Sequence, residues 1–236
     1  MPEATIKLKF MSRFNIFNPI HKALRAMLYD TSLTIQQTYF ADAEEAETAL
    51  EKVRTAVDIF DEHAAHEDHF VLPAIRRYEP SVVDAFELEH IKDHALSGGL
   101  RGLLTVYHHA IKTEVKIETG QAINKTFIEF MIFNLEHMAK EETVLNKILW
   151  RYYSDEEIRA INQRIVASIS PEEVGVTSAW MMRGMSNAEI SGWLKEVEKK
   201  APESVFTQLF SIAEKELPSG RFLKLLENLT EGTMVA

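Results

Sequence analysis

The sequence predicts an all-α protein built around an up-down four-helix bundle, and three observations carry this prediction. Glycine and proline are scarce, with nine and seven among 236 residues, so the chain has few of the residues that form turns. Apolar residues recur in steps of three and four along four long segments, which is the period of one helix face. The segments follow one another with short breaks, which favours antiparallel neighbours.

The four apolar stripes define the bundle that we expect over residues 18–152. They cover approximately residues 17–35, 46–79, 83–111 and 123–148. Asn18 followed by Pro19 is typical of a helix start, because asparagine caps helices and proline fits the first helical position. Pro73 lies inside the second segment, where it predicts a kink or a distorted turn.

The two ends of the chain differ from this pattern. Residues 1–17 are expected to form an N-terminal arm, and residues 153–236 a smaller C-terminal region of short helices. Within the latter, Ser154, Ser170 and Ser186 each precede acidic residues in the manner of helix N-caps. This region could contact a protein partner or a second copy of the chain.

Composition excludes several classes of protein. The chain has no cysteine, so disulfides, thiolate metal sites and iron–sulfur clusters are excluded, and any metal must be held by His, Asp or Glu. Its net charge of −10 argues against nucleic acid and against an anionic membrane surface as partners. There is no apolar run long enough to span a bilayer, and we expect a cytoplasmic protein.

Histidine and glutamate interrupt the apolar stripes in pairs that are four residues apart. The pairs are His63 with Glu67, His90 with His94 and His137 with Glu141, and His21 lies in the first stripe. A spacing of four places the second side chain about 40° around the helix and about 6 Å along it, so both can reach one point. Burying such groups costs several kcal/mol each unless they are paired or bind a metal.

Topology places the four groups at one height. In an antiparallel helix pair, residues at equal height are equidistant from the turn. The midpoints between successive groups fall at residues 43, 78.5 and 115.5, near expected turns at Asp42–Glu45 and Glu79-Pro80 and just before Gly120. By contrast, His108 lies 18 residues beyond His90, about 27 Å along the same helix, and is too distant to join them.

These seven residues exceed what a single ion needs. Two ions bridged by carboxylates fit the set better, with iron favoured by mixed His and carboxylate ligands and manganese or zinc as alternatives. A metal-free network of buried polar groups is the other interpretation, although every member of such a network must be hydrogen-bonded.

The pattern of His21, H63-x-x-x-E67, H90-x-x-x-H94 and H137-x-x-x-E141 resembles the hemerythrin-like (HHE cation-binding) domain family. The resemblance covers approximately residues 15–150. It implies a non-haem diiron centre with Glu67 and Glu141 as bridging carboxylates and an open coordination position for dioxygen or nitric oxide. The terminal ligands that it implies are His21, His63, His90, His94 and His137.

The resemblance leaves three kinds of function open. The protein could bind a diatomic gas reversibly, or sense it and respond through the C-terminal helices. It could also handle iron, either as a factor that repairs iron centres or as an enzyme that consumes peroxide or nitric oxide. The last motif has three residues between His137 and Glu141, a form found in the wider family that includes iron-centre repair and sensing proteins.

Overall fold

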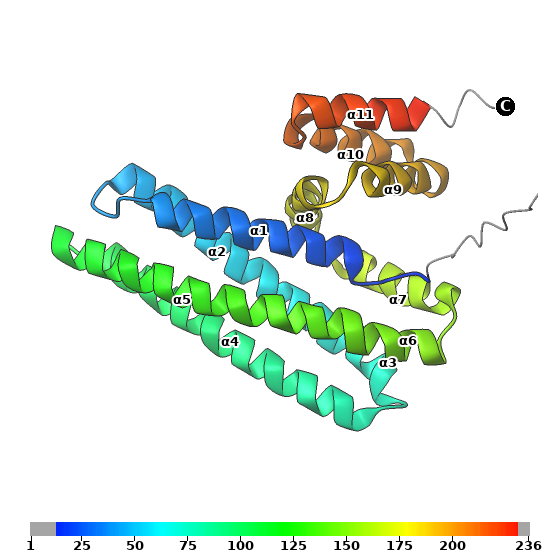
Figure 1. The fold of residues 1–236 in the computed structure, drawn as a ribbon, viewed down its shortest axis with the longest axis horizontal. Helices are drawn as coiled ribbons and strands as arrows, with labels where there is room; N and C mark the ends of the chain where they lie inside the picture. The colour runs from blue at the N-terminus through cyan, green and yellow to red at the C-terminus, as the bar shows by residue number, and fades with distance from the viewer. Residues whose placement is uncertain (1–12, 231–236) are drawn as a thin grey trace, which may run out of the picture.

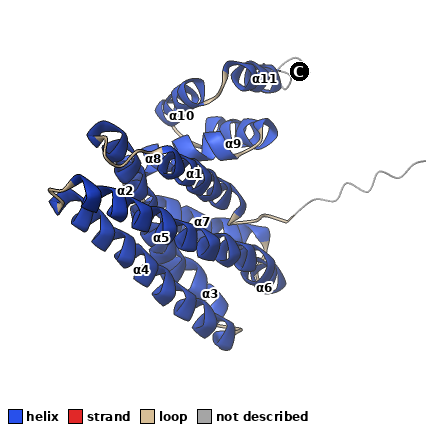
Figure 2. Cartoon of the chain, turned by 60° about the vertical axis from the view of Figure 1, so that its left-hand side comes forward, coloured by secondary structure: helices blue, strands red, loops and turns tan. Residues whose placement is uncertain are grey.

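A computed structural model describes residues 13–230, and this part of the chain is helical without any strand (Figure 2). The predicted all-α class is therefore confirmed for the described residues. Of the predicted N-terminal arm, residues 1–12 lie outside the described range. The remainder precedes the first helix without regular structure, and the Arg13 side chain donates hydrogen bonds to the carbonyl oxygens of Trp150 and Tyr153.

Four long helical segments lie side by side (Figure 1). They are α1 (Asn18–Gln37), α2 (Ala43–His66) continuing through η1 (Glu67–Val71) into α3 (Leu72–Arg76), α4 (Pro80–His109), and α5 (Thr113–Lys140) continuing through η2 (Glu141–Leu145) into α6 (Asn146–Tyr152). Helix α1 contacts α2 and α5, and α4 also contacts α2 and α5. The four segments therefore surround one interior.

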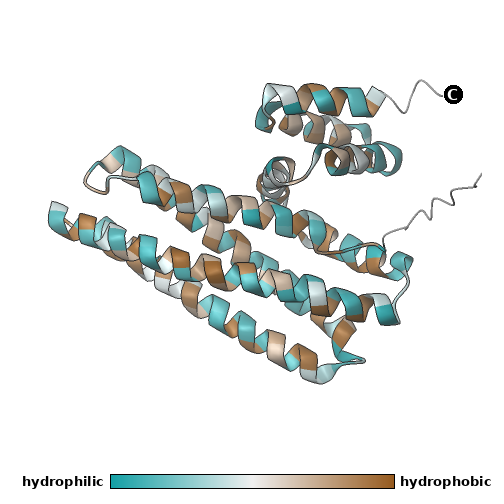
Figure 3. Cartoon of the chain, viewed as in Figure 1, coloured by the Kyte–Doolittle hydropathy of each residue, from teal (hydrophilic) through white to brown (hydrophobic). Residues whose placement is uncertain are grey.

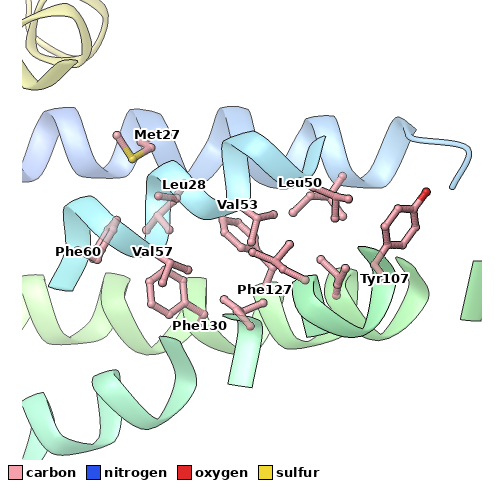
Figure 4. Close-up of a cluster of buried hydrophobic side chains, with 14 of the residues drawn as sticks. Met27, Leu28, Leu50, Val53, Val57, Phe60, Tyr107, Phe127 and Phe130 are labelled. Carbon is pink, nitrogen blue, oxygen red and sulfur yellow. The ribbon is translucent and has the colours of Figure 1, made fainter. Parts of the chain in front are cut away.

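Hydrophobic and hydrophilic residues alternate along these helices (Figure 3), as expected when one face of each helix is buried. The interior contains two apolar clusters. The first includes Phe60, Phe127 and Phe130 and lies toward the α1–α2 and α4–α5 turns (Figure 4). The second, which includes Phe17 and Phe86, lies toward the opposite end. On each long segment, the candidate ligands lie near the place where the first cluster gives way to the second.

The C-terminal helices pack against this assembly. They are α7 (Asp155–Ser168), α8 (Pro171–Gly184), α9 (Asn187–Lys200), α10 (Glu203–Glu216) and α11 (Ser219–Thr230). The three serine caps predicted here are confirmed, because Ser154, Ser170 and Ser186 each accept a hydrogen bond from the backbone N–H three residues on. The cap expected at Asn18 is wrong, because Phe17 is the N-cap residue of α1 and makes no side-chain cap hydrogen bond. Helix α8 packs across α1, and α9, α10 and α11 pack on one another around a third apolar cluster (Figure 1).

Over residues 13–230, no helix combines the length and the apolar character needed to cross a membrane.

Candidate metal centre

Six of the seven candidate residues converge between the two apolar clusters. Their ligand atoms form two groups, and within each group all atoms lie within 4.8 Å of one another. The groups are His21, His63, Glu67 and Glu141, and Glu67, His90, His137 and Glu141. The two glutamates belong to both groups. His63 is the most exposed of the six side chains, at 12%. These buried groups could hold metal.

Each glutamate presents one oxygen to each group. Glu67 Oε1 lies 3.2 Å from His63 Nε2, whereas its Oε2 lies 3.4 Å from His90 Nε2. Glu141 Oε2 lies 3.3 Å from His21 Nε2, whereas its Oε1 lies 3.0 Å from His137 Nε2. Two ligand atoms bound to one ion at about 2.1 Å are separated by about 3.0–3.4 Å. The spacing therefore suits two ions bridged by both carboxylates.

Six polar atoms of the centre lack a hydrogen-bond partner within the described part of the chain. Among residues 13–230, Nε2 of His21 and His63 and all four carboxylate oxygens of Glu67 and Glu141 are buried without a hydrogen bond. Such atoms are rare in folded proteins, because each one loses its hydration without compensation. Cations within the two groups would give every one of these atoms a partner, so the residues present fit a bound metal pair.

Carboxylates outside the two groups orient three of the four histidines. A carboxylate only accepts hydrogen bonds, so the ring nitrogen facing it is the one that donates, and the Nε2 lone pair is left directed at the centre. The Nδ1–carboxylate distances are 2.9 Å for His21 with Glu142, 2.7 Å for His90 with Asp68 and 2.8 Å for His137 with Glu89.

Two of these outer carboxylates immediately follow the shared glutamates. Asp68 follows Glu67 and contacts His90, and Glu142 follows Glu141 and contacts His21. The sequence prediction missed both acids. Their signal was present in the sequence, because H-x-x-x-E followed by an acid occurs at residues 63–68 and again at residues 137–142.

The electrostatics of the centre favour positive charge. Burial by itself lowers the pKa of His90, but the hydrogen bond to Asp68 and the nearby carboxylates of Glu141 and Glu67 outweigh it and raise the pKa to about 12. Burial also lowers the pKa of His137, but the nearby Glu141 carboxylate outweighs this effect and the pKa is raised to about 9. Burial raises the pKa of Glu67, but the nearby histidines hold it well below its usual range. Protons or metal cations can supply this positive charge.

Both shared glutamates begin a π-helical turn. In each turn, the backbone N–H of the residue five positions on, Leu72 or Asn146, donates to the carbonyl oxygen of the glutamate. The distortion predicted at Pro73 is thus confirmed as the turn Glu67–Val71. Proline does not explain both π-helical turns, because no proline follows the turn Glu141–Leu145. Isolated π-helical turns are frequent at functional sites.

The structure does not bring His94 to the other six residues. Its side chain is 48% exposed, and its Nδ1 lies 3.0 Å from Asp61 Oδ1. The buried face of α4 instead includes Asp93, which accepts a hydrogen bond from Asn134 at 2.7 Å. The buried positions of α4 advance strictly in steps of three and four, through residues 83, 86, 90, 93, 97, 100, 104 and 107. His94 is one position beyond this row.

Comparison of the chain with protein-family models, curated proteins and solved structures found no match. The resemblance to hemerythrin-like domains therefore stays an interpretation of the ligand pattern.

Proposed function

We propose that residues 18–152 form an up-down four-helix bundle of the hemerythrin-like kind, which holds two iron ions and binds dioxygen or nitric oxide there. The observation that carries this proposal is the pair of four-atom groups sharing both oxygens of Glu67 and of Glu141. A carboxylate that faces two groups with its two oxygens is suited to join two cations.

The donor set supports iron over zinc. Each group offers two imidazole nitrogens and two carboxylate oxygens. Four ligands complete the tetrahedral coordination typical of zinc, whereas non-haem iron takes mixed His and carboxylate ligands and retains positions for a small molecule. When bound, the iron pair would supply the open coordination position for a diatomic gas. Manganese is the alternative that elemental analysis has to separate from iron.

Surrounding side chains close one half of the centre. The ring of Phe133 stacks on His137 with centroids 5.9 Å apart, and Phe86 lies 5.6 Å from the same ring. His63, in the other group, is the most exposed ligand. We therefore propose that His21 and His63 would hold the ion on the more accessible side of the centre, where a gas would enter.

Metal content of purified full-length protein tests the metal pair. We expect about two iron ions per chain in the wild type and a clear loss in His137→Ala. His108→Ala is the matched control, because His108 is exposed and belongs to neither ligand group. Equal metal content in the two variants would refute the assignment.

Gas binding is tested on the iron-loaded, reduced protein under anaerobic conditions. Titration with nitric oxide or with dioxygen should change the ultraviolet–visible spectrum saturably. A spectrum that does not respond to either gas, in protein that carries both ions, contradicts gas binding while leaving the metal pair intact.

A further inference from the structure

A cavity of about 830 Å³ lies between the long helices and the C-terminal helices. Its walls come from α1 and α2 on one side and from α7, α8, α9 and α10 on the other. Of the six converging residues, His63 and Glu67 line it. The volume lies in the range of about 300–1,000 Å³ typical of small-molecule sites. The cavity therefore meets the centre at the group that contains His21 and His63.

The cavity walls are mainly apolar. Ile20 and Ile59 contribute from the long helices, and Ile165, Val174 and Met181 contribute from the C-terminal helices. All five side chains are half-buried rather than covered by the protein. Because removing apolar surface from water is favourable, a ligand that covers these side chains gains free energy from their burial.

Four of the charged side chains that line the cavity already have partners of opposite charge within the protein. The pairs are Glu189 with Lys22, Glu196 with Lys200, and Glu196 with Arg159. An ionic ligand would have to compete with one of these pairs, which costs affinity. A neutral ligand leaves all of them in place.

We propose that this cavity binds a neutral, mainly apolar organic molecule whose inner end lies against His63 and Glu67. Its placement beside a metal ion rests on the proposed function, whereas occupation of the cavity does not. The C-terminal helices thus complete a ligand site, because they supply one wall of it.

Occupation is tested with the neutral fluorophore N-phenyl-1-naphthylamine and metal-free, full-length protein. The fluorophore brightens in apolar surroundings, so we expect a saturable rise in emission. Gly192 lines the cavity, and a Cβ added there meets nothing within 4 Å. Gly192→Phe should therefore fold and should weaken binding at least tenfold by occupying the space. Thr177→Phe introduces the same ring from α8 and should also weaken binding.

Gly102→Phe is the matched control. Gly102 lies at an exposed position of α4, its added Cβ also meets nothing within 4 Å, and it does not line the cavity. This variant should bind the fluorophore as the wild type does. Absence of binding to the wild type, or equal binding by all four proteins, overturns the proposal.

The charge of the ligand is tested with 1-anilinonaphthalene-8-sulfonate, which has the same ring system with a sulfonate added. It should bind at least tenfold more weakly than the neutral fluorophore. Equal or tighter binding of the sulfonate overturns the assignment of a neutral ligand.

Placement beside the ion is tested with cobalt(II)-loaded protein. Adding N-phenyl-1-naphthylamine should alter the visible absorption of cobalt in the wild type, and much less in Gly192→Phe at the same concentration. A fluorophore that binds without altering this absorption overturns the placement. If cobalt does not bind at all, the proposed function fails while fluorophore binding to the metal-free chain still reports on the cavity.

Discussion

Nε2 of His90 lies 3.1 Å from Nε2 of His137. Each ring directs its Nδ1 at an outer carboxylate, Asp68 or Glu89, so the two Nε2 atoms face one another. Two imidazole nitrogens at this distance repel one another unless a proton or a cation lies between them. Two nitrogen ligands at adjacent positions of one ion, each bound at about 2.1 Å, are about 3 Å apart. The spacing of the two rings therefore suits either a shared proton or two ligands of one ion.

The different environments of His90 and His94 predict different effects on metal binding. His90→Ala removes a buried ligand atom and should lower the iron content by about half or more. His94→Ala removes an exposed side chain outside both ligand groups, and its iron content should equal that of the wild type. Elemental analysis of the two variants, purified identically, checks this. An equal loss in both would mean that His94 moves into the centre.

Because Glu67 belongs to both ligand groups, we expect its replacement to change the number of bound ions differently from the replacement of a histidine in one group. Glu67→Gln removes a charged ligand of both ions, so both should bind weakly. His63→Ala leaves the group of His90 and His137 complete and should retain about one ion per chain. Titration of each metal-free variant with ferrous iron, followed by calorimetry, measures the number of ions bound. If His63→Ala lost both ions while Glu67→Gln retained one, a bridging role for Glu67 would be contradicted.

Packing of α8 on α1 predicts that Gly184 tolerates no side chain. A Cβ added at Gly184 would collide with the backbone carbonyl oxygen of Lys22, next to His21. Because backbone atoms have little room to move, Gly184→Ala should lower the free energy of unfolding by about 1–3 kcal/mol. Gly175→Ala is the control on the same helix, since its added Cβ meets nothing within 4 Å, and it should be neutral or stabilising. Urea denaturation compares the two.

We expect the contact between α9 and α1 that Glu189 makes with Lys22 and Asn18 to weaken in acid. Burial raises its pKa, but hydrogen bonds from Lys22, Ser186 and Asn18 outweigh this and lower the pKa from 4.5 to about 2. A pKa that is lower in the folded chain means that the ionised group stabilises the fold. This contribution is complete above pH 4.5 and is lost as the pH falls toward 2.

The measurement is the free energy of unfolding of the wild type and of Glu189→Gln between pH 2 and pH 7. The wild type should be the more stable above pH 4.5, and the difference should shrink toward pH 2. Glu198→Gln, at an exposed position of the same helix, controls for the loss of one negative charge and should leave stability nearly unchanged. A difference that does not vary with pH would refute the role of this carboxylate.

The helical class and two of the ligand pairs follow from local pattern. His63 with Glu67 and His137 with Glu141 each lie within one continuous helical segment, where a spacing of four fixes their relative positions. The serine caps of the C-terminal helices are equally local, because each involves a hydrogen bond between residues three apart. Such features depend on neighbours in the chain and can be recognised without a fold.

Which face of α4 turns inward was decided by packing. His90 and His94 have the same spacing as the other pairs, yet the row that includes Phe86, Leu100 and Leu104 rotates the helix so that Asp93 is buried and His94 is exposed. The contacts of His90 with Asp68 and of His21 with Glu142, and the cavity under the C-terminal helices, join residues from different helices. They arise only when the helices are packed together, because the relative rotation and height of helices depend on side chains far apart in the sequence.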